Sequence, residues 1–214
     1  MNTKRLIEVL GTNLQPVDRR GFAKSVVLAV AVGAVAAFGM MLATIGPRPQ
    51  LASLPHLEWS AIKLLFALSV VGTGVANLVR SARPGAPTRS LPAVLPFLVV
   101  GAAALAVLLL TTPGAWKHML LGAAPSSPGR CLLCIIGFAA LPLLALIHVL
   151  REGAPTRPGV CGAMAGAVAG GAGAAAYTLA CRSDSILFIT VWYVAGIALC
   201  AALGAVLGPR LLRW

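Results

Sequence analysis

The chain has 214 residues, of which 59% are hydrophobic and 10% are charged, and its formal net charge is +12. Its apolar residues come in long blocks and not at the spacing of amphipathic helices, which excludes an ordinary soluble globular domain. No HExxH, GxSxG or phosphate-binding loop occurs in the sequence, so nothing supports a hydrolase or a nucleotidase.

The chain begins with a polar and basic segment, residues 1–22, which comes before the first apolar block. That order predicts a cytoplasmic appendage and not a cleaved signal peptide. Its apolar residues predict a short amphipathic helix ending near Gly11 and then an extended stretch; they are Leu6, Ile7, Val9, Leu10, Leu14, Pro16 and Val17. The segment is either a helix on the membrane surface or a docking peptide for a cytosolic partner.

Six apolar blocks, each about 20 residues long, occupy the rest of the chain and are long enough to cross a hydrocarbon layer of about 30 Å as helices. Backbone groups in lipid must be hydrogen-bonded within their own segment, so residues 23–214 are predicted to form an all-α bundle of six transmembrane helices. The abundant Gly and Ala favour close helix packing. The blocks are approximately 25–45, 61–79, 94–110, 131–150, 161–179 and 186–207.

The basic residues are distributed unevenly among the connections. Twelve belong to the N-terminal segment, the second and fourth connections and the tail: Lys4, Arg5, Arg19, Arg20, Lys24, Arg80, Arg83, Arg89, Arg151, Arg157, Arg210 and Arg213. Five belong to the other three connections and their helix ends: Arg48, Lys63, Lys117, Arg130 and Arg182. The positive-inside rule then places both termini in the cytoplasm and explains the net charge without nucleic acid. The Lys63 side chain is expected to extend back to the outer headgroups.

This orientation places Cys131, Cys134 and Cys181 at the outer face, at helix ends that water can reach, and Cys161 and Cys200 toward the inner side. Three interpretations stay open for the outer thiols. Cys131 and Cys134 could form a redox CxxC at a helix N-terminus, or Cys131 and Cys181 could form a sensor that closes a disulfide or holds a thiophilic cation. In the third interpretation, the thiols are small packing residues.

The remaining polar residues of the apolar blocks offer little chemistry. Asn77 and His148 lie near inner helix ends. Hydrogen bonds to water or to carbonyl groups of the bundle explain these side chains more simply than a role as ligands. The acidic residues all fall outside the predicted membrane core, which disfavours a secondary transporter that needs an intramembrane carboxylate. A carrier of a neutral solute or of a metal stays possible, as does a membrane thiol-disulfide oxidoreductase.

Four segments in order, LIEVLGTNLQPV, CLLCI, YTLACRSDS and LGPRLLRW, together resemble the NrsF family of bacterial inner-membrane anti-sigma factors. The resemblance implies a non-enzymatic protein without a cofactor or direct nucleic-acid binding. Its implied partner is an extracytoplasmic-function sigma factor of the SigF type, held at the cytoplasmic face by the N-terminal segment. It also aligns Cys131 and Cys181 with the family's two cysteines, implying that they sense heavy metal or oxidative stress together and that Cys134 is incidental.

Overall fold

The computed structural model describes residues 3, 19–49, 54–81, 91–110, 127–153, 155 and 157–212. All regular structure in these residues is helical, which confirms the all-α prediction. The elements are α2 (Arg19–Thr44), α3 (Leu54–Ser81), α4 (Leu91–Leu110), α6 (Pro128–Glu152), α7 (Pro158–Thr178), α8 (Ile186–Phe188), the π-helical turn η1 (Ile189–Tyr193) and α9 (Val194–Leu211).

Five helical stretches have the length and hydropathy to cross a membrane: Gly21–Thr44, Leu57–Arg80, Pro128–Glu152, Pro158–Thr178 and Ile186–Leu211. The last of these joins α8, η1 and α9. The remaining predicted helix, the block at residues 94–110, corresponds to α4, which has 20 residues and carries the shorter apolar stretch Pro96–Leu108. Most helices extend a few residues beyond the predicted blocks, because polar residues at the ends, such as Arg19, Glu152 and Arg210, continue the helical hydrogen bonding.

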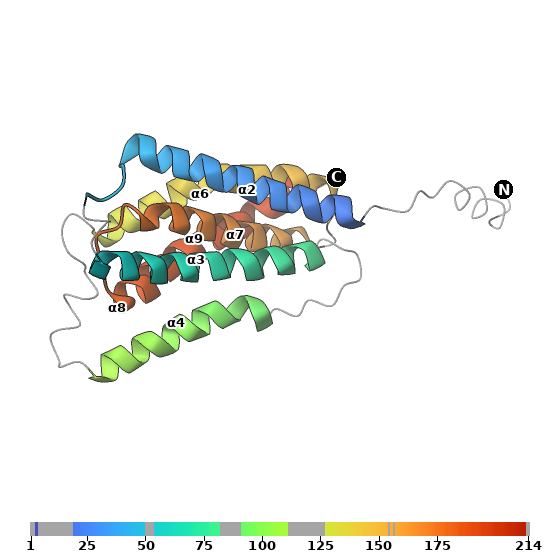
Figure 1. Cartoon of the computed structure of the whole chain (residues 1–214). Helices are drawn as coiled ribbons and strands as arrows, with labels where there is room; N and C mark the ends of the chain where they lie inside the picture. Colours follow the sequence, from blue (N-terminus) through green and yellow to red (C-terminus); the bar gives the residue numbers. More distant parts are fainter. Residues whose placement is uncertain are drawn as a thin grey trace.

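The helices form a bundle in which α2, α3, α6 and α9 surround α7, while α4 lies along the outside against α3, α8 and η1 (Figure 1). One end of the bundle contains the beginning of α2 and the end of α9, where Arg151 Nε donates to the Leu211 carbonyl at 2.9 Å. We call it the terminal end. The opposite end contains Arg48, Cys131 and Cys181, and we call it the cysteine end.

Helix α7 can occupy the centre because it consists largely of Gly and Ala, and every residue from 168 to 178 is buried. A Cβ atom on Gly162 would collide with the Gly204 carbonyl of α9, and one on Gly166 with the Cys200 carbonyl. A Cβ on Gly173 would collide with the Ile135 carbonyl of α6 on another side. Small residues at four-residue spacing thus bring the helix backbones into direct contact, which is a major source of stability where lipid removes the hydrophobic drive between helices.

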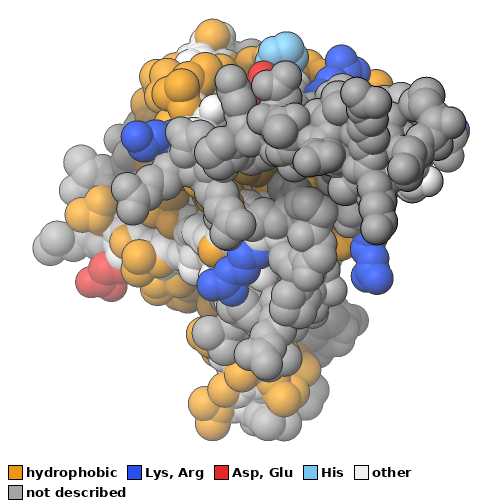
Figure 2. Space-filling model, turned by 90° about the vertical axis from the view of Figure 1, so that its right-hand side faces the viewer, with side chains coloured by type: hydrophobic (Ala, Val, Ile, Leu, Met, Phe, Trp, Pro, Cys, Tyr) orange, Lys and Arg blue, Asp and Glu red, His pale blue; other side chains and the backbone are white. Residues whose placement is uncertain are grey.

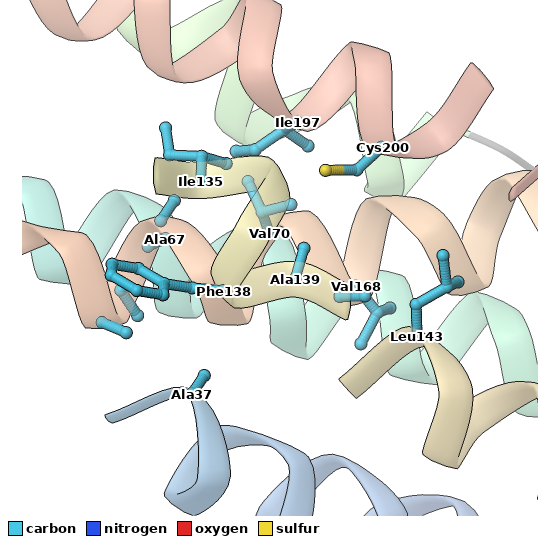
Figure 3. Close-up of a cluster of buried hydrophobic side chains, with 14 of the residues drawn as sticks. Ala37, Ala67, Val70, Ile135, Phe138, Ala139, Leu143, Val168, Ile197 and Cys200 are labelled. Carbon is cyan, nitrogen blue, oxygen red and sulfur yellow. The ribbon is translucent and has the colours of Figure 1, made fainter. Parts of the chain in front are cut away.

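Apolar side chains of several helices fill the remaining interior (Figure 3). Ala37 of α2, Val70 of α3, Phe138 of α6, Val168 of α7 and Ile197 of α9 all belong to this core. Helix α4 is attached to it by an edge-to-face pair of Phe66 and Phe97, whose ring centroids are 5.9 Å apart. This packing determines how α2, α6 and α7 come together at the cysteine end of the bundle.

Candidate functional site at the cysteine end of the bundle

Three charged residues from distant parts of the chain meet at the cysteine end. Arg48 donates from Nη1 and Nη2 to the two carboxylate oxygens of Asp184, at 3.1 and 2.9 Å, and Lys63 Nζ donates to Oδ1 at 3.1 Å. The side chains of Arg48 and Lys63 are 3% and 0% exposed, and that of Asp184 is 17% exposed. The prediction that Lys63 extends to the headgroups is wrong, because a carboxylate within the bundle satisfies its ammonium instead.

Arg48 also binds the connection between α7 and α8 through backbone groups. Its N–H donates to the Leu179 carbonyl at 3.0 Å, and its Nη1 donates to the Cys181 carbonyl at 2.9 Å. The turn that brings Arg48 there depends on Gly46, whose φ of +73° is a left-handed conformation that glycine adopts without strain. The end of α2 is thereby fixed to the segment that carries Cys181.

Cys131 lies in the first turn of α6, where Pro128 and the N-cap residue Ser127 start the helix. Its N–H donates to the Ser127 carbonyl at 3.1 Å, and the Ser127 hydroxyl accepts from the Arg130 N–H at 3.4 Å. Cys181 follows the end of α7, and its N–H donates to the Tyr177 carbonyl at 2.9 Å. Secondary structure thus sets the backbone position of both thiols.

The thiols of Cys131 and Cys181 lie close enough to interact electrostatically with each other, and Cys131 also with Lys63. Both residues are 0% exposed and are free thiols, whereas Cys134 is half-buried. The expectation that water reaches these two cysteines is therefore wrong, because both are completely buried in the folded chain.

Two tyrosines flank the pair of thiols. The rings of Tyr177 and Tyr193 are 6.2 Å apart, and both side chains neighbour Cys131 and Cys181. Tyr193 is fully buried at the end of the π-helical turn η1; its hydroxyl lies beside the side chains of Cys181 and Thr178 but makes no hydrogen bond of standard geometry among the described residues. A π-helical turn inserts one extra residue into the helix, and here it precedes α9 next to the thiols.

The other candidate residues are explained by packing or local hydrogen bonds. Cys161 and Cys200 are buried, and Cys200 packs against Gly166 and Gly170. Asn77 donates to the Thr73 carbonyl of its own helix at 2.7 Å, as its position near a helix end led us to expect. In the described part of the chain, no three His, Cys, Asp or Glu residues form a group that could hold a metal ion.

The terminal end is rich in exposed basic side chains, and Figure 2 shows Lys and Arg around the grey atoms at this end. Those that the structure describes are Lys24, Arg80, Arg151, Arg157 and Arg210. The predicted docking residues Leu6, Ile7, Val9, Leu10, Leu14 and Pro16 lie outside the described residues.

Sequence reasoning missed the cluster of Arg48, Lys63 and Asp184. The available signal was three ionisable residues at the outer ends of apolar blocks. Asp184 is 136 residues from Arg48 and 121 residues from Lys63, however, so no local pattern connects it to them.

Comparison with known proteins identifies the family. The model of the family described as "NrsF: Negative regulator of sigma F" matches residues 10–214. The chain belongs to this family. It is also similar to "Probable anti-sigma-F factor NrsF" of Azospira oryzae and "Anti-sigma-F factor NrsF" of Caulobacter vibrioides, at 32% identity each, with all of both chains covered. No solved structure matches this member of the family.

Proposed function

We propose that this protein is an anti-sigma factor of the inner membrane that holds a SigF-type extracytoplasmic-function sigma factor at its cytoplasmic face. The observation that carries the proposal is the full-length membership in a family of negative regulators of sigma F. The exposed basic residues at the terminal end support a cytoplasmic location for that end and for both termini. The N-terminal segment, with Leu6, Ile7, Val9, Leu10, Leu14 and Pro16, is the proposed docking element.

Cys131 and Cys181 are the proposed sensor at the opposite end. Two thiols can lose their protons to water and bind a thiophilic cation through both sulfurs, or pass two electrons and two protons to an oxidant and form a disulfide. Both reactions pull the first turn of α6 and the connection after α7 together. Because both thiols are completely buried, either reaction requires the bundle to rearrange first so that the cation or the oxidant can reach them.

Helix α2 provides a physical connection between the proposed sensor and the docking segment. Arg48, four residues beyond its end, binds the Cys181 carbonyl, and its first residue, Arg19, directly follows the segment 1–18. A straight helix of 26 residues is about 39 Å long, enough to carry a displacement across the membrane. A change at Cys181 that weakens the Arg48 contacts therefore biases the position of α2 and of the attached docking segment.

The docking proposal is tested by co-purification of the sigma factor from detergent extracts. Deleting residues 1–18 removes the docking segment and leaves α2 to insert, so we expect an inserted protein that no longer retains the sigma factor. A Leu6→Glu, Leu10→Glu variant places charge in the apolar docking face and should behave like the deletion. Full retention by the deletion variant would contradict docking through this segment.

The sensing proposal is tested with a sigma-dependent transcription reporter, with and without cadmium or an oxidant. Cys131→Ser and Cys181→Ser should repress normally but not respond, and the double variant should be no worse than either single one because the pair acts as a unit. Cys134→Ser is the matched control at the same end and should respond like the parent. If Cys131→Ser and Cys181→Ser respond to cadmium or the oxidant like the parent protein, both thiols are packing residues and not sensors.

A further inference from the structure

A cavity of about 170 Å³ at the cysteine end is lined by three arginines from three different elements. Arg48 follows α2, Arg130 lies in the first turn of α6 and Arg182 follows α7. The other described residues of the wall are Ile45, Gly46, Pro47, Tyr177 and Ala180, and none of them is a carboxylate.

The charge around the cavity is unbalanced. Asp184 is the carboxylate bound to Arg48, and it also accepts from Lys63, so one negative charge is shared between two buried cations. Arg130 and Arg182 also line the wall; both side chains are exposed, and Arg182 makes a further interaction of its own. Arg130 lies at the N-terminus of α6, where the partial positive charge of the helix dipole acts in the same direction.

Arg48 retains an unused hydrogen-bond donor. The residue is 5% exposed, and its two terminal nitrogens are bound to Asp184 and to the Cys181 carbonyl. Its Nε is buried and has no hydrogen-bond partner in the part of the chain that the structure describes. A buried donor without an acceptor on a cationic residue is unfavourable, and a nearby negative charge relieves the cost.

We propose that this cavity binds a tetrahedral oxyanion through Arg48, Arg130 and Arg182. Guanidinium groups present planar pairs of donors that match the oxygens of phosphate and sulfate, and several converging arginines favour a doubly charged group. The cavity is large enough for such an ion. A water molecule takes up about 30 Å³ in the liquid, so five heavy atoms need about 150 Å³ at most, and the cavity offers about 170 Å³. A free inorganic dianion and the phosphate of a lipid headgroup share this chemistry.

The site lies next to the two thiols. Arg130 and Arg182 are the chain neighbours of Cys131 and Cys181, and Arg48 binds the Cys181 carbonyl, so a bound oxyanion lies near both cysteines. The bound group also connects the end of α2 to the start of α6 and the connection after α7, and the last two elements carry the thiols. This effect on the thiols rests on the proposed function, whereas anion binding itself does not.

The test uses the full chain purified in a neutral detergent and titrated with sodium sulfate at constant ionic strength, with chloride as the replaced anion. Sulfate should bind and raise the midpoint of thermal unfolding. Because a hydrogen bond to a charged group contributes about 1.5–3 kcal/mol, Arg130→Gln and Arg182→Gln should each weaken sulfate binding by about tenfold or more. Arg157→Gln and Arg210→Gln make the same charge change at the terminal end and should leave the sulfate affinity unchanged.

A second arm identifies the source of the oxyanion. Phosphatidylglycerol retained by the parent but lost from the Arg130→Gln, Arg182→Gln double variant identifies a lipid headgroup, and unchanged lipid together with sulfate binding identifies a free ion. The proposal is overturned if sulfate has no more effect than chloride and the retained lipid is unchanged, or if the cavity variants match the terminal-end controls. No sigma factor is present, so this result is independent of the co-purification that tests the proposed function.

Discussion

The charge cluster of Arg48, Lys63 and Asp184 gives the sharpest prediction about stability, through Asp184→Asn. The substitution keeps the size of the side chain but removes the negative charge that two buried cations share. It also replaces one carboxylate oxygen by an amide NH₂ that cannot accept from Arg48. The expected result is a large loss of stability together with a loosened connection between α2 and the segment after α7.

The magnitude follows from the burial of the partners. Removing one partner of a buried ion pair costs about 3–5 kcal/mol, because an uncompensated charge is left behind. The Asp184 side chain is 17% exposed, so water offsets part of the cost and we expect the lower half of that range. Adding Lys63→Met removes one of the two uncompensated cations and should recover on the order of 1 kcal/mol.

The assay is unfolding in mixed detergent micelles. The extent of unfolding is monitored by chemical labelling of the thiols that are buried in the folded protein. Glu58→Gln is the matched control, since Glu58 is an exposed carboxylate at the same end and its neutralisation should change the free energy of unfolding by less than about 0.5 kcal/mol. In Asp184→Asn, labelling of Cys181 under native conditions should also increase, because Arg48 loses the carboxylate that holds it against the Cys181 carbonyl. Equal stability of Asp184→Asn and Glu58→Gln would refute a structural role for this cluster.

Three further predictions address packing, the orphan hydroxyl and orientation. Gly166→Ala should lower the free energy of unfolding by about 1–3 kcal/mol, because its Cβ collides with α9, whereas Gly72→Ala, with open space at its Cβ, should be neutral or slightly stabilising. Tyr193→Phe removes a buried hydroxyl that makes no hydrogen bond of standard geometry among the described residues and should raise the thermal midpoint; a lower midpoint would mean that the hydroxyl binds the neighbouring Cys181 thiol. A reporter fused after Trp214 should report a cytoplasmic location, and periplasmic alkaline phosphatase activity there would invert the proposed topology.

The helices were predictable because their cause is local. Each apolar block must satisfy its own backbone groups in lipid, so composition and length within one block are sufficient to predict a spanning helix. The same holds for Asn77, whose side chain binds the carbonyl of Thr73 four residues earlier. The start of α6 also has a local cause, since Ser127 is its N-cap and Pro128 its first residue, although the predicted block began only at residue 131.

The position of α7 was only partly predictable. Its Gly and Ala content indicated close packing, but that content does not say which helices it contacts. The structure shows that Gly162 and Gly166 face α9, whereas Gly173 faces α6. Small side chains permit close approach on every side of a helix, so the partner on each side is decided by the other helices.

By itself, the sequence determined the helical class, the approximate spans, the family resemblance and the proposed importance of Cys131 and Cys181. Only the tertiary structure decided that those two thiols are buried together, that Lys63 turns inward to Asp184, and that three arginines line one cavity. The physical reason is the range of the interactions. Backbone hydrogen bonds in a helix join residues four apart, whereas the pairing of Arg48 with Asp184 spans 136 residues and exists only after the helices have packed.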